Sequence, residues 1–133
     1  MTDENKTIVQ RALAGLIETG DVDALARVLS ADFVHHRPGS ITSTKSEWLE
    51  AVRVALASLA GMRVEIHQVL ADGDHVVVYS RRWLPEAGPE IAVVDIWRID
   101  DGAIAEGWEI IEPVARVAAN LRWWEPAEPA LSS

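Results

Sequence analysis

Hydrophobic residues recur at helical spacing in two runs near the start of the chain. The first run follows Thr2 and Asp3, either of which can cap a helix, and it stops at Gly20, which can end one. Asp21 can cap a second, short helix, and residues 30–32 interrupt its pattern. The apolar positions of the two predicted helices are Ile8, Val9, Ala12, Leu13, Leu16 and Ile17, and then Val22, Leu25, Ala26 and Leu29.

A third helical pattern follows a short segment that we expect to be extended. Residues 33–39 form this segment, because Pro38 disfavours the helical conformation of the residue before it. Thr44 and Glu47 have the spacing of a capping box, so a long helix is predicted to begin there and to end at Gly61. The buried face of this helix is predicted to comprise Trp48, Leu49, Val52, Leu56, Leu59 and Ala60.

From Met62 onward the hydrophobic period changes to two, which predicts β-strands. A first strand runs to a turn at 71–74, a second covers 75–84, and a loop at 85–89 leads into a β-hairpin over 91–113. Strands joined by tight turns pair antiparallel, and helices that precede such a sheet indicate the α+β class. We therefore expect three helices and a curved four-stranded sheet that leaves a cavity at one end.

The hairpin is the segment most informative about function. Asp95 and Glu109 each sit between apolar residues of a strand, where a carboxylate is costly unless it is paired or faces a cavity. The turn at 100–102 leaves two registers open. A two-residue loop would place Trp108 opposite Asp95, whereas a three-residue loop with a glycine bulge would place Gly107 and Glu109 on the face of Asp95. We favour the three-residue loop.

Composition and charge narrow the function classes. The chain has 133 residues, a formal net charge of −9 and no Cys, which argues against nucleic-acid binding, disulfides and thiolate chemistry. The first residues are polar and acidic, and no apolar run is long enough to cross a membrane. We expect a cytoplasmic protein with no membrane association, built as a single domain over 1–133, with a core at 3–115 and a tail at 116–133.

The C-terminal residues allow two separate structural predictions. Residues 114–124 are predicted to form a short helix, and the Pro-containing end after it reads as flexible. Two adjacent tryptophans, Trp123 and Trp124, should not face water freely, so we expect the tail to pack on the domain or on a second subunit.

Three segments resemble the SnoaL-like polyketide cyclases of the nuclear-transport-factor-2-like (NTF2-like) superfamily. These are Phe-Val-His-His-Arg-Pro at 33–38, Val-Val-Asp-Ile-Trp-Arg-Ile at 93–99 and Asp-Gly-Ala-Ile-Ala-Glu-Gly-Trp-Glu at 101–109. The resemblance covers roughly residues 3–115. It implies a cone-shaped α+β barrel with a deep apolar pocket, and a homodimer formed through the sheet. The superfamily is a scaffold for many chemistries, so the resemblance is specific for fold rather than reaction.

In the cyclases, an acid and a His act as acid and base in an intramolecular aldol condensation. The resemblance places that His at His36, the strand acid at Asp95 and a second polar position at Glu109. This chain departs from the pattern at Gly107, where many relatives carry His, and at Glu109, where they carry Asp. These departures concern the cyclase reaction more than the fold.

The candidate site combines acids with a polar and aromatic lining. We expect Asp95 to be the general acid/base, Glu109 its partner, and His36 a proton relay or orienting group near the pocket mouth. If the two acids share a pocket face, burial and mutual repulsion should raise the pKa of at least one. Alternatively, Asp95 is structural and accepts hydrogen bonds from Arg82, Arg98 or a backbone amide. The expected ligand-binding residues are Trp48, Tyr79, Trp97, Trp108 and Arg82.

Three functions remain open on the sequence alone. The first is a cofactor-independent cyclase, isomerase or hydratase that acts on a hydrophobic carbonyl compound. The second is a module that binds an apolar ligand without turnover. The third is an epoxide hydrolase, which would need an Asp-Arg-Asp set that includes Asp95 and Arg82. No metal is expected, because the adjacent His35 and His36 would face opposite sides of a strand.

Overall fold

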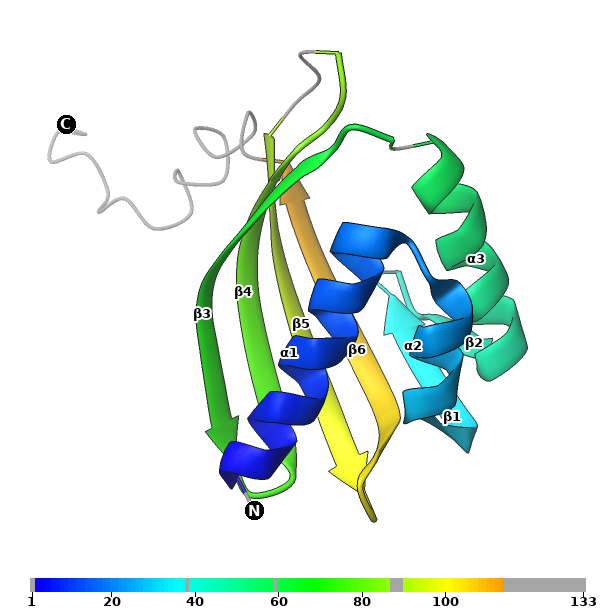
Figure 1. Cartoon of the computed structure of the whole chain (residues 1–133), viewed down its shortest axis with the longest axis vertical. Helices are drawn as coiled ribbons and strands as arrows, with labels where there is room; N and C mark the ends of the chain where they lie inside the picture. The colour runs from blue at the N-terminus through cyan, green and yellow to red at the C-terminus, as the bar shows by residue number, and fades with distance from the viewer. Residues whose placement is uncertain (1, 38, 59, 87–89, 114–133) are drawn as a thin grey trace, which may run out of the picture.

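The computed structural model describes residues 2–37, 39–58, 60–86 and 90–113, which form one helical layer against one sheet (Figure 1). The elements in chain order are α1 (Thr2–Thr19), α2 (Val22–Val28), β1 (Leu29–Arg37), β2 (Ile41–Thr44), α3 (Lys45–Ser58), β3 (Arg63–Asp72), β4 (His75–Trp83), β5 (Glu90–Asp100) and β6 (Ala103–Pro113). The predicted tail helix and Trp123 and Trp124 lie outside the described residues.

Three predicted helix ends are confirmed by their caps, whereas Leu29, predicted in the second helix, begins β1, and α3 ends at Ser58, before the predicted Gly61. The backbone N–H of Gly20 donates to the carbonyl of Leu16 (2.9 Å) as α1 ends. The Asp21 carboxylate accepts the N–H of Ala24 (3.0 Å) at the start of α2. The capping box before α3 is complete, since Thr44 N–H donates to the Glu47 carboxylate (2.9 Å) and Glu47 N–H to the Thr44 hydroxyl (3.3 Å).

The sheet has six strands rather than the predicted four, in the order β2-β1-β6-β5-β4-β3. The additional strands come from residues expected to form the end of a helix, an extended piece and a loop. β1 pairs antiparallel with β2 and parallel with β6, whereas β3 to β6 pair antiparallel in sequence order. Because β1 pairs with a strand about 70 positions later, no local pattern marks it as part of the sheet.

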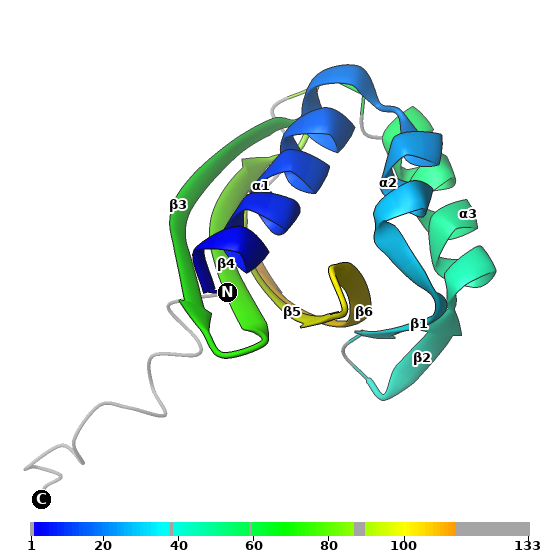
Figure 2. The ribbon, with the colours of Figure 1, turned by 60° about the horizontal axis from the view of Figure 1, so that its bottom comes forward.

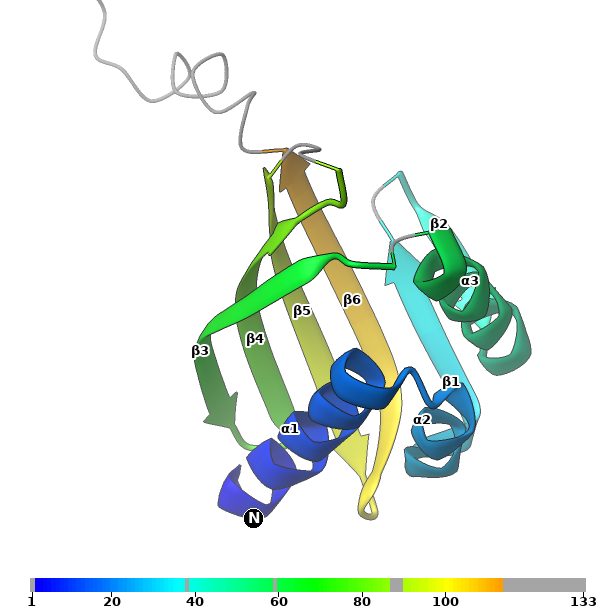
Figure 3. The same cartoon turned by 45° about the horizontal axis from the view of Figure 1, so that its top comes forward.

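All three helices cover the same face of the curved sheet. α1 crosses that face diagonally, while α3 lies beside β1 and β2 (Figure 3). The sheet curls around the helical layer in the view along its end (Figure 2). We call the helix-covered face the inner face and the opposite one the outer face. Within the described residues, no helix is long and apolar enough to span a membrane.

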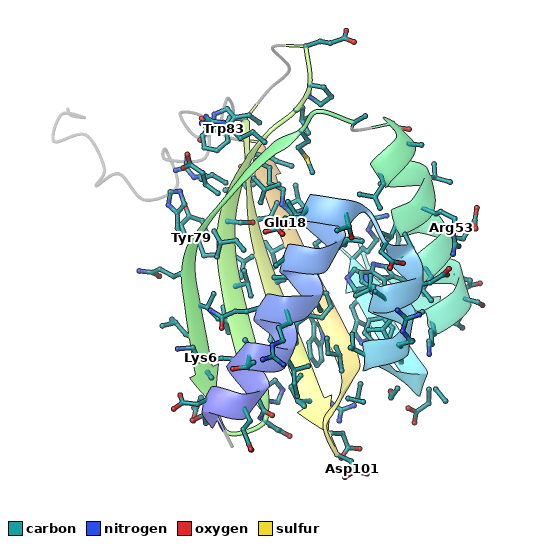
Figure 4. All side chains as sticks on the ribbon, in the orientation of Figure 1. Lys6, Glu18, Arg53, Tyr79, Trp83 and Asp101 are labelled. Carbon is teal, nitrogen blue, oxygen red and sulfur yellow. The ribbon has the colours of Figure 1, made fainter. Side chains whose placement is uncertain are left out.

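Side chains fill the space between the helices and the sheet at one end of the molecule. Toward the β5–β6 turn, whose tip carries Asp101 (Figure 4), the inner face and helices form a closed core. Its apolar side chains, each at most 5% exposed, include Val9, Leu25, Phe33, Val76, Val78 and Ile99. Toward the other end of the sheet, the layers separate around a cavity.

Candidate active site

The β5–β6 hairpin sets which residues face the cavity. Asp100 pairs with Ala103, and Asp101 and Gly102 have positive φ values of 52° and 78°, so the turn is a two-residue type I′ loop. The predicted three-residue loop is therefore wrong. The register between β5 and β6 then changes between Ile99 and Arg98, because Ala105 is an extra, unpaired residue in β6 and forms a bulge.

The bulge restores the register that the sequence analysis favoured. Beyond it, Trp97 faces Gly107 and Asp95 faces Glu109. The prediction that the two acids share one face is thus confirmed. If Ala105 paired regularly with Arg98, with no bulge, period-two alternation would place Trp108 opposite Asp95.

A cavity of about 360 Å³ lies between this part of the inner face and the helices. Its size falls within the usual range for small-molecule sites. Its apolar wall comes mainly from α1, α3 and the start of β3, and includes Leu13, Leu16, Ile17, Val52, Leu56 and Met62. Four charged side chains from the sheet also line it: Arg37, Arg82, Asp95 and Glu109. A largely apolar cavity with a few convergent polar groups is typical of a ligand site.

Asp95 is the buried acid of the cavity, at 3% exposure. Its Oδ2 atom lies 3.3 Å from Nη2 of Arg82, which β4 projects from the neighbouring strand. Burial raises the pKa of Asp95 to about 7; Arg82 opposes the increase, and Glu109 adds to it. A carboxyl group with this pKa can exchange protons in either direction near neutral pH.

Glu109 faces Asp95 but has a different partner. Its Oε1 atom lies 3.3 Å from Nε of Arg37, which belongs to β1 on the far side of β6. The cavity therefore holds two acid–arginine pairs side by side. The sequence analysis missed Arg37, although it shares strand alternation with Phe33 and His35, which are both buried.

Trp48, Trp97 and Arg82 line the cavity as predicted. The structure does not bring His36, Tyr79 or Trp108 to it. His36 and Trp108 lie on the outer face, because they alternate with inward-facing His35 and Gly107 in paired registers. Their predicted places in the pocket are wrong for this reason.

On the outer face His36 has its own partners. Its Nε2 atom lies 2.6 Å from Oε2 of Glu106, and its ring stacks on Trp108 with centroids 5.3 Å apart. Arg98 Nε donates to Glu106 as well (3.1 Å). These contacts account for His36 without any role in the cavity.

Tyr79 also points away from the cavity, to the outer side of β4, as Figure 4 shows. Its hydroxyl accepts a hydrogen bond from Nε of Arg81 (2.8 Å), and its ring meets His67 edge-on. Alternation again explains the error, because buried Val78 and Ser80 flank Tyr79 in the strand.

The inward histidine is His35, which the sequence analysis did not select. It is 1% exposed and stacks on Trp48 with ring centroids 4.8 Å apart. Burial, with a smaller effect of nearby Arg37 and His36, lowers its pKa to about 4, so the imidazole is neutral at neutral pH. It lies behind Trp48 and Trp97 rather than on the cavity wall.

Across the described ranges, no three His, Asp or Glu side chains are gathered as a metal site. The charged groups that line the cavity are the two carboxylates of Asp95 and Glu109 and the two guanidinium groups of Arg37 and Arg82. A raised-pKa acid beside a second acid and an arginine suits proton transfer to and from a bound organic molecule.

Residues 9–107 match the family model of the SnoaL-like domain. The chain belongs to the SnoaL-like domain family. No curated protein sequence matches this SnoaL-like protein. Its helices on a curved sheet are the NTF2-like fold, which solved structures of low sequence identity share.

One such structure is an NTF2-like protein from Mesorhizobium loti, with 19% identity, a TM-score of 0.72, and coverage of 84% of this chain and 93% of that one. A candidate ketosteroid isomerase from Kribbella flavida has 16% identity and a TM-score of 0.74, covering 85% and 81%. IdmH, a candidate polyketide cyclase from Streptomyces antibioticus, has 22% identity and a TM-score of 0.66, covering 82% and 97%. At these identities the likenesses establish the fold of this SnoaL-like protein.

Proposed function

We propose that this SnoaL-like protein is an acid/base enzyme that acts on a hydrophobic carbonyl compound, as a cyclase of the aldol type or as an isomerase. One observation carries the proposal: Asp95, a buried carboxyl group with a pKa of about 7, lines an apolar cavity opposite Glu109. The named relatives, a candidate cyclase and a candidate isomerase, support the same class.

In the proposed reaction, ionised Asp95 removes a proton from the carbon next to the carbonyl of the ligand, which leaves an enolate. Arg82 lies beside Asp95, and its positive charge stabilises the enolate oxygen. Protonated Asp95 then returns the proton to another carbon of the same ligand, which completes an isomerisation. Alternatively, the enolate carbon attacks a second carbonyl in the ligand, and the alkoxide that forms takes the proton.

Glu109 is proposed to assist by position and charge. Its pairing with Arg37 holds the carboxylate opposite Asp95, where its charge raises the pKa of Asp95. The two acids thereby have unequal roles, since Asp95 exchanges the proton and Glu109 adjusts the pKa of Asp95.

Exchange of the α-hydrogens of 1-indanone in D₂O, followed by NMR, tests the proposal. Asp95→Asn should lower the protein-dependent exchange rate by about 10²–10⁴-fold, the usual contribution of a positioned acid/base. Glu106→Gln is the matched control, because it removes a carboxylate from the outer face of the same sheet. Exchange by Asp95→Asn at the wild-type rate would contradict the proposal.

A second candidate function is epoxide hydrolysis, which the convergence of Asp95, Arg82 and Glu109 favours. In this reaction one carboxylate takes a proton from water as the water oxygen attacks an epoxide carbon, and a protonated acid donates to the epoxide oxygen. The set differs from the expected Asp-Arg-Asp in carrying Glu109 as its second acid. Formation of a diol from styrene oxide, lost in Asp95→Asn, would support it.

The remaining alternative is a binding module that holds an apolar ligand without turnover. A binding module would bind 1-indanone both as the wild type and as Asp95→Asn, and neither protein would exchange the α-hydrogens. That result would contradict both enzymatic proposals and support the binding module.

We also propose a homodimer formed through the outer face of the sheet. Support comes from its apolar surface, in which Ile110 is 54% and Leu70 59% exposed, with half-buried Ile96 between them. Light scattering after gel filtration should give twice the chain mass for the wild type and the chain mass for Ile110→Asp. A wild-type monomer at micromolar concentration would rule the dimer out.

A further inference from the structure

The cavity ends, below Asp95, on the indole ring of Trp97. This side chain is 5% exposed and lies on the cavity wall, two positions after Asp95 in β5. Trp48 meets it edge-on, with ring centroids 5.9 Å apart and an interplanar angle of 62°. Together the two indoles close the cavity toward the β5–β6 turn.

The ring of Trp97 rests directly on the backbone of Gly107 in β6, the residue opposite it. A Cβ atom at position 107 would lie 2.7 Å from Cε3 of Trp97 and would also overlap Cζ3 of that ring. Glycine in a strand interior commonly marks such a close approach. The indole therefore occupies this place only because residue 107 has no side chain.

Behind the ring there is no further space for a ligand. Phe33 and Val76 are at most 1% exposed, and Ile99 is 5% exposed. His35 also lies there, with a ring centroid 6.1 Å from that of Trp97. Trp97 Nε1 and His35 Nδ1 are, in the described part of the chain, the two buried side-chain polar atoms without a hydrogen-bond partner. The indole of Trp97 is thus held by packing and not by a hydrogen bond.

The distance along β5 between Asp95 and the indole ring of Trp97 is short. Two residues of a strand span about 7 Å, and the indole fills part of that length. A ligand carbonyl that reaches Asp95 therefore has room for at most one ring on its deep side. Any longer part of the ligand has to extend the other way, past Ile17 and Met62 toward Gly20 and Gly61.

We propose that Trp97, seated on Gly107, is the specificity-determining floor of the pocket and restricts it to ligands whose reacting carbonyl lies in a terminal ring. The proposal rests on the proposed function only in taking Asp95 as the group that meets the carbonyl. It requires no turnover, so binding alone can test it.

Two rigid ketones form a matched pair for the test. In 1-indanone the carbonyl lies in a terminal ring, whereas 9-fluorenone adds a second benzene ring on the other side of the same carbonyl. The extra ring buries more apolar surface and should favour fluorenone in a pocket of unlimited depth. Calorimetry or ligand-observed NMR gives both dissociation constants without any reaction.

The wild type should bind 1-indanone at least about tenfold more tightly than 9-fluorenone, against the hydrophobic trend. Trp97→Ala should reverse the order, and Trp97→Phe should lie between the two and serve if the alanine variant does not fold. Gly107→Ala, which forces the indole toward the cavity, should weaken binding of both ketones. Trp108→Ala, a tryptophan removed from the outer face, should leave the wild-type order unchanged.

Several results would overturn the proposal. Tighter binding of 9-fluorenone by the wild type would do so, as would an unchanged order in folded Trp97→Ala and Trp97→Phe. Binding of neither ketone by the wild type would also count against it. If the wild type shows the expected order of affinities but no hydrogen exchange, the proposed reaction is wrong and the proposal for Trp97 stands. The two failures are therefore distinguishable.

Discussion

The two faces of the sheet carry similar groups with opposite electrostatic behaviour. On the inner face, Asp95 pairs with Arg82 and has a pKa raised to about 7. On the outer face, burial alone would raise the pKa of Glu106, but hydrogen bonds from His36 and Arg98 outweigh it and lower that pKa. Both acids belong to the β5–β6 hairpin, and each faces a charged residue across it.

The difference shows that partners do not by themselves determine how an acid titrates. The Asp95 side chain is 5% exposed and has one arginine and one carboxylate nearby, whereas the Glu106 side chain is 24% exposed and is hydrogen-bonded to both His36 and Arg98. Removal from water dominates at Asp95, whereas at Glu106 the hydrogen bonds and charges of His36 and Arg98 together outweigh the effect of burial. The same pair of strands therefore carries an acid with a raised pKa on one face and an acid with a lowered pKa on the other.

The largest expected effect is on the pH dependence of stability. The pKa of Asp95 is about 7 when folded and ordinarily 3.8, so between these values the folded chain binds a proton that the unfolded chain has released. The contribution of Asp95 to the free energy of unfolding should accordingly be fully present below pH ~4 and be lost, by a total of about 4 kcal/mol, as the pH rises through ~7.

Asp95→Asn should abolish this decrease, because asparagine does not titrate. Denaturant unfolding of both proteins at several pH values between about 4 and 8 measures it. Glu106→Gln is the comparison, and its sign is opposite: a lowered pKa stabilises above the ordinary range of Glu, and that stabilisation is lost on acidification. A wild-type curve parallel to that of Asp95→Asn would show that Asp95 titrates normally.

A second prediction concerns the tight packing of the inner face. Gly107→Ala should lower the free energy of unfolding by about 1–3 kcal/mol, because the new Cβ forces Trp97 out of its place. Gly15→Ala in α1 is the control, since a Cβ there meets nothing within 4 Å, and alanine favours the helix. Thermal unfolding should separate the two variants, and equal melting temperatures would contradict the close contact.

A third prediction compares two arginines. Arg82 lowers the pKa of Asp95 from what burial alone would give, so Arg82→Leu should raise it and move the midpoint of the exchange-rate profile to higher pH. Arg98→Leu removes the same charge from the outer face and should leave the midpoint in place. A carboxylate NMR titration reports the pKa directly and does not depend on catalysis.

The smallest effect is expected from the outer-face cluster itself. Partly exposed ion pairs contribute about 0–1 kcal/mol, so Glu106→Gln should change the free energy of unfolding at neutral pH by no more than that. A decrease in the free energy of unfolding several times larger would mean that the outer face is buried in solution, as in the proposed dimer. If the dimer buries it, the large effect of Glu106→Gln should disappear when the protein also carries Ile110→Asp.

Local signals in the sequence predicted the local structure. Gly20, Asp21 and the Thr44–Glu47 pair mark helix ends through contacts within four residues, and all of them are found. The antiparallel strands from β3 to β6 follow from short turns in the same way. The parallel pairing of β1 with β6 left no such mark, because it joins segments about 70 positions apart with no turn between them.

The candidate site was predictable wherever one residue of a strand was known to face inward, because the residues at every second position then face inward too. Asp95 and Glu109 stood out because each is an acid within an apolar strand. His36 was chosen by resemblance, but counting from buried Phe33 in steps of two leads to His35 and then to Arg37. The bulge at Ala105 carries no glycine or other signal, so the turn alone would have given the wrong register.

The bulge at Ala105 also decides how the site responds to a change in chain length. Ile104 pairs with Ile99 and Glu106 with Arg98, so Ala105 is the one residue of this stretch that the pairing leaves out. Its loss, a three-nucleotide deletion in a gene, would remove the bulge and still leave Glu109 opposite Asp95. An inserted residue that paired regularly between Glu106 and Glu109 would instead turn Glu109 toward the outer face. The same segment thus tolerates a shorter chain better than a longer one.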